Sequence, residues 1–159
     1  LNYMHDIKES MLKEVEKVQN KEFGESQFET ACFHIVEEYT PKIVEIYRQK
    51  YKIYNHIRQY LQQKKGNRKF YFFGTGGYCE DIIREIKIVP DAFLDNDREK
   101  AGLYIHQKQI FHPTQIQDWK NCFILITVKK PDIIFSIEQQ LQKCDLNKYQ
   151  DYMIAVELF

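Results

Sequence analysis

Residues 70–80 read Phe-Tyr-Phe-Phe-Gly-Thr-Gly-Gly-Tyr-Cys-Glu, and the fold prediction depends on this stretch. The aromatic run 70–73 is typical of a short buried strand, and the glycines that follow it indicate a turn. A helix is predicted over 78–88. Gly74 would then make the tight turn. Gly76 would allow the backbone to approach a phosphate at the helix N-terminus, or would adopt a positive φ.

An acidic residue follows where a dinucleotide-binding fingerprint has one. Asp95 ends the next predicted strand, 91–94, and lies 19 residues after Gly76. A carboxylate at this place accepts hydrogen bonds from ribose hydroxyls. Cys79 replaces the third glycine of the fingerprint, at a position that governs helix–strand packing. The pattern predicts a nucleotide-type ligand. The alternative is a plain strand–helix–strand unit whose glycines meet only backbone demands.

Strands and helices alternate through the rest of the chain. Short strands are predicted at 69–73, 91–94, 109–111, 122–128 and 152–156, and helices at 78–88, 113–119 and 131–143. Such alternation indicates a parallel sheet with right-handed crossovers. We therefore predict an α/β fold: a small Rossmann-like, mostly parallel sheet of four or five strands over residues 66–159, preceded by a helical segment, 1–65.

The helical segment is predicted to hold three helices. The first spans 5–20, with Ile7, Met11, Val15 and Val18 on one stripe. The second begins at a capping-box pattern, Ser26 with Glu29, and runs to about residue 39. The third runs from Pro41, a proline at the first helical position, to about residue 64. Basic residues and a glycine at 64–67 indicate the helix end and the domain boundary.

A family resemblance is carried by four runs within residues 70–113, and more loosely 70–157. These runs are Phe-Phe-Gly-Thr-Gly-Gly at 72–77, Phe-Leu-Asp-Asn-Asp at 93–97, Lys-Ala-Gly at 100–102 and Ile-Phe-His-Pro at 110–113. They resemble the Rossmann-like domains of bacterial surface-glycan biosynthesis proteins. Such domains accompany sugar acyltransferases, sugar C-methyltransferases or glycosyltransferases. The resemblance implies a nucleotide sugar or a related dinucleotide-like ligand.

The candidate ligand-binding residues follow from the turn, from the strand ends and from the acid after the second strand. They are Gly74, Thr75, Gly76, Gly77, Tyr78, Asp95, Asn96 and Lys129. Lys129 and its neighbour Lys130 are considered because ligands of open α/β sheets lie beyond the carboxyl ends of strands. No catalytic residue is assigned. No metal is expected, because His106 and His112 lack a third ligand nearby in the sequence.

We therefore predict a domain that binds a nucleotide sugar or an NAD-like molecule. It would be accessory to glycan biosynthesis and fused to, or associated with, a transferase. Two alternatives remain. One is the cofactor-binding part of an NAD-dependent oxidoreductase or of a sugar-modifying methyltransferase, although about 94 α/β residues leave little room for a substrate domain. The other is a protein-interaction module that binds no ligand.

Charge is balanced over the chain, with 23 basic and 23 acidic residues, but not locally. Residues 1–39 carry four Lys and nine acidic groups, whereas residues 42–69 carry nine Lys or Arg and one Glu. The basic helix is expected to pair with the acidic helices of residues 1–39, in the same chain or in a partner, rather than with nucleic acid. Its heptad spacing at Tyr47, Tyr54 and Leu61 indicates packing on the neighbouring domain, with a homo-oligomer through helix 41–64 as the alternative.

Four scattered cysteines without a Cys-x-x-Cys pair are expected to be free thiols. No apolar run reaches the roughly 18–20 residues of a membrane span. The opening residues have neither the charged nor the apolar region of a signal peptide. The chain begins with Leu, so we expect residue 1 to lie within a longer protein. The predicted location is the cytoplasm.

Overall fold

The computed structural model describes residues 2–19 and 25–159. The chain divides into two compact units, residues 1–53 and 54–159. Composition places a boundary near residue 65, whereas contacts place it at residue 53. The difference arises from the last turns of a long helix, whose Leu61 is fully buried in the core of the second unit.

The first unit contains α1 (Asn2–Gln19) and the beginning of α2 (Glu25–Lys65). The stripe predicted on α1 is confirmed: Ile7 is buried, and Met11, Val15 and Val18 are half-buried. Tyr39 is buried on α2. The predicted capping box at Ser26 involves a side chain outside the described ones.

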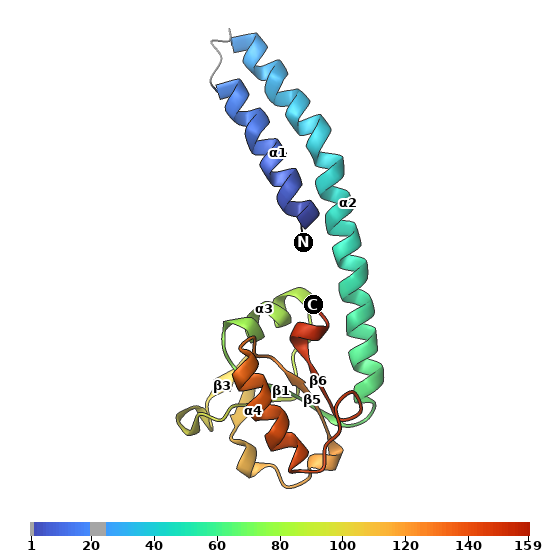
Figure 1. Cartoon of the computed structure of the whole chain (residues 1–159), viewed down its shortest axis with the longest axis vertical. Coiled ribbons are helices and arrows are strands. Elements are labelled where there is room, and N and C mark those ends of the chain that lie inside the picture. The colour runs from blue at the N-terminus through green and yellow to red at the C-terminus, as the bar shows by residue number, and fades with distance from the viewer. Residues whose placement is uncertain (1, 20–24) are drawn as a thin grey trace. The chain divides into compact units, whose positions relative to one another are not determined.

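The predicted break at Pro41 is wrong, because α2 is one helix of 41 residues that passes through this proline. Pro41 has no N–H to donate to the carbonyl of Glu37, which normally weakens a helix interior. Glu37 lies at an exposed position, so water can bind the freed carbonyl. The Lys42 ammonium also pairs with Glu38 across this turn at 2.8 Å. The α2 helix therefore connects the two units without interruption (Figure 1).

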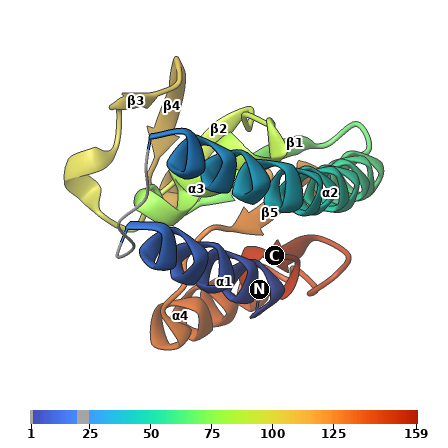
Figure 2. The same cartoon turned by 90° about the horizontal axis from the view of Figure 1, so that it is seen from above.

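The second unit is built on a six-stranded sheet of order β3-β4-β2-β1-β5-β6 (Figures 1 and 2). All pairings are parallel except β3 with β4. A mixed α/β fold with a mostly parallel sheet is thus confirmed. The elements are β1 (Lys69–Phe73), α3 (Gly77–Ile86), β2 (Ala92–Leu94), β3 (Tyr104–Ile105), β4 (Lys108–Phe111), β5 (Cys122–Ile126), α4 (Pro131–Gln142) and β6 (Tyr152–Ile154).

The extra strand comes from a hairpin that the sequence analysis missed. β3 and β4 are joined by His106 and Gln107, both with positive φ (48° and 63°). Two-residue turns of this geometry usually contain Asn or Gly. Because His and Gln stand here instead, the sequence gives no hairpin signal. The helix predicted at 113–119 is also wrong. Two short 3-10 turns, Pro113–Gln115 and Trp119–Asn121, take its place, capped by the side chains of His112 and Asp118.

Alternation along the strands creates a hydrophobic core on each face of the sheet. Phe70 and Phe72 face α3 and the end of α2, where Tyr54 and Ile57 also pack against the core. Tyr71 faces the opposite side, which α4 covers with Ile134, Ile137 and Leu141. Tyr54 and Leu61 therefore confirm the predicted packing of their heptad face, while Tyr47 is 59% exposed.

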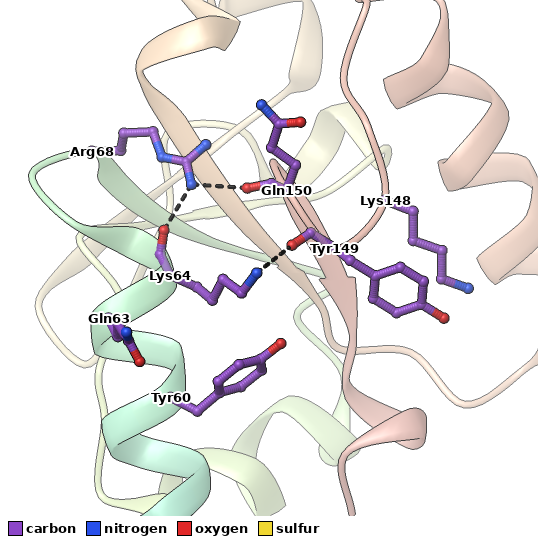
Figure 3. Close-up of a pocket in the computed structure, with 7 residues that line it drawn as sticks. All are labelled: Tyr60, Gln63, Lys64, Arg68, Lys148, Tyr149 and Gln150. Atoms are coloured by element: carbon purple, nitrogen blue, oxygen red, sulfur yellow. Dashed lines mark hydrogen bonds between the residues drawn. The ribbon is translucent and has the colours of Figure 1, made fainter.

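The junction between α2 and β1 is held by Arg68. Gly66 ends the helix with φ +57°, and its amide donates to the Gln62 carbonyl at 3.1 Å, as predicted for a C-terminal glycine. The Arg68 guanidinium donates to the carbonyls of Lys64 (2.7 Å) and Gln150 (2.9 Å; Figure 3). It also pairs with the Asp151 carboxylate at 2.9 Å. These contacts join the start of β1 to the loop before β6.

We expect Arg68→Ala to lower the free energy of unfolding by about 2–4 kcal/mol, because it leaves Asp151 and the two carbonyls without their donor. Urea denaturation measures the loss. The matched control is Arg84→Ala, which breaks the exposed pair with Asp81 and should cost less than about 1 kcal/mol. Equal losses in the two variants would contradict a structural role for Arg68.

Candidate functional site

The turn after β1 needs glycine at its first position. Gly74 has φ +110°, and a Cβ built on it would lie 2.5 Å from the Val128 methyl carbon and 3.2 Å from the Thr127 carbonyl oxygen. The Thr127 hydroxyl also donates to the Gly74 carbonyl at 2.7 Å. Gly74 therefore allows the end of β1 to approach the segment that follows β5. The fold alone therefore explains why residue 74 is a glycine.

The next two glycines are different. A Cβ built on Gly76 or Gly77 would meet no atom within 4 Å. Gly76 is the N-cap of α3 with φ −83°, so the positive φ considered for it is found at Gly74 instead. No side chain caps the N-terminus of α3. Packing and backbone geometry thus do not demand glycine at 76, whereas an approaching ligand would.

Cys79, which replaces the third glycine, packs in the core. The side chain is 1% exposed and belongs to the cluster that contains Ile82 and Phe72. Burial raises the pKa of its thiol to about 12, so the thiolate is not available near neutral pH. All four cysteines are free thiols, as predicted.

Asp95 links the glycine turn to the end of β2. The Thr75 hydroxyl and the Lys100 ammonium both donate to one of its carboxylate oxygens, the ammonium at 3.0 Å. The Asp97 amide donates to the other oxygen at 2.9 Å. Burial alone would raise the pKa of Asp95. The hydrogen bonds from Thr75 and the Asp97 amide, together with Lys100, outweigh burial and hold the pKa below its usual range.

This network changes what Asp95 offers to a ligand. The sequence analysis expected a carboxylate that accepts bonds from hydroxyls, but both of its oxygens already accept bonds within the protein. Lys100 was not a predicted site residue. It lies on the 3-10 turn Arg98–Lys100, and no spacing rule connects it to the glycine turn. Its Nζ also lies 3.2 Å from the Thr75 hydroxyl oxygen. Asp97 instead caps this 3-10 turn, as its polar surroundings predict.

All eight candidate residues line one pocket of about 380 Å³. The pocket lies at the carboxyl ends of β1 and β5, where the sheet order changes direction. Such switch points are where open α/β sheets bind ligands. Lys129 lies with its Nζ 4.5 Å from the centre of the Tyr78 ring. The remaining lining residues are Phe73, Thr127, Val128, Lys130, Ile133 and Ile137, which make one wall largely apolar.

The two histidines have local partners. His106 contacts the Glu80 carboxylate through Nε2 at 2.8 Å, and His112 caps the 3-10 turn that follows β4. Within residues 2–19 and 25–159, no group of three His, Cys, Asp or Glu side chains is placed to hold a metal ion.

A second pocket, of about 660 Å³, lies at the amino ends of the strands (Figure 3). Its lining includes Lys64, Arg68 and Lys148. Besides the contacts described above, Arg68 donates to the carbonyls of Lys65 (3.3 Å) and Cys122 (3.5 Å). Lys64 donates to the Tyr149 carbonyl at 3.1 Å. Lys148 pairs with Glu157 at 2.6 Å and Glu138 at 3.5 Å. Because internal acceptors bind these cations, the pocket is better explained by structure than by ligand binding.

Comparisons with protein-family models, with curated proteins and with solved structures found no match for this chain. Among the described helices, none combines the length and the apolar character that crossing a bilayer requires.

Substitutions at Gly74 and Gly76 should lower the free energy of unfolding by different amounts. Gly74→Ala should cost at least about 2 kcal/mol, because it combines a positive φ with a clash against Val128. Gly76→Ala should cost about 1 kcal/mol or less, since the added methyl meets nothing and φ is ordinary. Urea denaturation of the two variants checks this. Similar losses at both positions would show that the turn does not make the described close approach.

The contribution of Asp95 to the free energy of unfolding should depend on pH. Asp95→Asn should lower the free energy of unfolding at pH 7 by about 1.5–3 kcal/mol, since the bonds involve a charged group. Its folded pKa is depressed, so this contribution is complete above about pH 5 and disappears as pH falls through the folded pKa. Denaturation at pH 7, 5 and 3 should show the wild-type advantage shrinking with acidity. A constant difference down to pH 3 would contradict the ionised network.

Proposed function

We propose that residues 54–159 form a Rossmann-like domain that binds a nucleotide sugar or a related dinucleotide-like molecule. The strand order supports this. Beginning at β1, the chain adds β2 and β4 on one side and then crosses to add β5 and β6 on the other. A doubly wound nucleotide-binding sheet has the same order. The β3 hairpin strand extends one edge and leaves the switch point unchanged.

The observation that carries the proposal is the pocket at the switch point, with two glycines that the fold does not require. Gly76 and Gly77 leave the N-terminus of α3 open to the pocket. Unpaired amides and the helix dipole favour an anion at such an end. The pocket also falls within the range of about 300–1,000 Å³ that is usual for small-molecule sites.

Each part of the pocket then has a role in the proposal. The amides of Gly76 and Gly77 receive a phosphate, and Lys129 supplies a positive charge beside it. The apolar wall formed by Val128, Ile133 and Ile137 accommodates the base or the sugar. Asn96 lines the same pocket and offers an amide to hydroxyl groups. Asp95 orients Thr75 and Lys100 at the rim of the pocket.

We further propose that the domain serves glycan biosynthesis in the cytoplasm, beside or fused to a transferase. The four runs that resemble surface-glycan biosynthesis domains support this, and three of them contribute to the site described here. Phe73 to Gly77, Asp95 and Asn96 line the pocket, and Lys100 binds Asp95.

Isothermal calorimetry with UDP-glucose, GDP-mannose and NAD⁺ tests the proposal. We expect the wild-type chain to bind at least one of these probes. Gly76→Val should abolish that binding because its side chain enters the phosphate position, while thermal unfolding shows a folded domain. Asp118→Ala, outside the pocket, is the control and should bind like the wild type. Equal binding by wild type and Gly76→Val, or no binding of any probe, would overturn the proposal.

A further inference from the structure

α2 carries a second apolar face within the first unit. Six positions separated by three or four residues lie on one side of the helix. We call them the α2 stripe: Phe33, Val36, Thr40, Val44, Tyr47 and Tyr51. All six are exposed, including Phe33 at 60% and Tyr51 at 66%. A contiguous exposed apolar face of this kind is typical of an interaction surface.

The stripe is distinct from the face that α2 buries within its own unit. The buried or half-buried positions include Ile35, Tyr39, Ile43 and Ile46, which also recur at three or four residues. At about 100° per residue, this face is centred about 100° away from the stripe. A helix that is apolar on two faces needs a second partner.

The charge of α2 indicates what that partner is. Residues 25–41 contain four Glu and no Lys or Arg, whereas residues 42–65 contain seven Lys or Arg and only one acid, Glu45. A second α2 lying parallel would place like charges side by side. An antiparallel second copy would place each acidic half against a basic half, which is the complementary arrangement.

The spacing of the stripe is nearly symmetric about residue 42, since Val36 lies six residues before it and Tyr47 five residues after it. Phe33 and Tyr51 lie nine residues to either side, and Thr40 and Val44 lie two residues to either side. A two-fold axis at this point would bring Phe33 opposite Tyr51 of the second copy and Thr40 opposite its Val44. Self-complementarity of this kind is what an isologous dimer interface requires.

We propose that the α2 stripe binds a second copy of this chain in antiparallel orientation. This surface shares only Tyr47 with the heptad seam of helix 41–64 considered in the sequence analysis. Tyr54 and Leu61 of that seam pack into the core of the second unit, so the seam is not free to pair. The interface lies instead toward the N-terminal half of α2, over residues 33–51.

Sedimentation velocity of the full chain tests the association. We expect a monomer–dimer equilibrium whose dissociation constant rises with added NaCl, because salt screens the attraction between opposite charges. Tyr47→Glu should raise the dissociation constant at least tenfold. Ile53→Glu is the control, because it introduces the same charge at a similarly exposed position (56% exposed, against 59% for Tyr47). Ile53 lies about 140° around the helix from the centre of the stripe. This variant should leave the dissociation constant unchanged. A monomer at 100 µM, or equal effects of the two variants, would overturn the proposal.

Disulfide trapping tests the orientation. In a Cys32→Ser, Cys144→Ser background, chains with Phe33→Cys are mixed with chains with Tyr51→Cys and oxidised. The antiparallel dimer should give the mixed 33–51 crosslink. It should give no 33–33 crosslink, because these positions would lie about 27 Å apart along the helices. A dominant 33–33 crosslink, or a dimer that tightens with salt, would show parallel pairing and overturn the orientation.

Discussion

The close approach of β1 and β5 at their carboxyl ends determines the shape of the α/β unit. The Thr127 amide donates to the Phe73 carbonyl at 2.8 Å, and its hydroxyl donates to the Gly74 carbonyl at 2.7 Å. Thr127 is 1% exposed, so these bonds satisfy a polar group that would otherwise be costly to bury. A Cβ at residue 74 would lie 2.5 Å from the Val128 methyl carbon, so a side chain there would force the Val128 side chain or the turn to shift. The pocket exists at this point because the chain leaves both strands here in different directions.

Packing on both faces of the sheet fixes where β1 ends. Both faces of the central strands are covered, one by α3 with the end of α2 and the other by α4. Shifting the register of β1 by one residue would exchange Phe70 and Phe72 with Tyr71 and Phe73 between two differently shaped cores. The packed layers therefore fix where β1 ends, and with it the position of the glycine turn and the N-terminus of α3.

The sequence predicted those parts whose signals are local. The strand at β1, the two longer helices of the α/β unit and the helix end at Gly66 follow from periodicity and glycine placement. The eight candidate residues could be grouped because the carboxyl ends of parallel strands meet. The β3 hairpin could not be predicted, because His106 and Gln107 adopt positive φ without the usual residues. Lys100 was missed since its contact with Asp95 depends on how the loop folds back.

The contacts among Thr75, Asp95 and Lys100 hold the glycine turn against the end of β2 before any ligand binds. A ligand that binds there would therefore not have to order a flexible loop. Preorganisation of this kind reduces the entropic cost of association. It also makes the rim selective. A ligand hydroxyl that binds Asp95 would have to displace the Lys100 ammonium or the Thr75 hydroxyl. Only a group that donates at least as well could replace them.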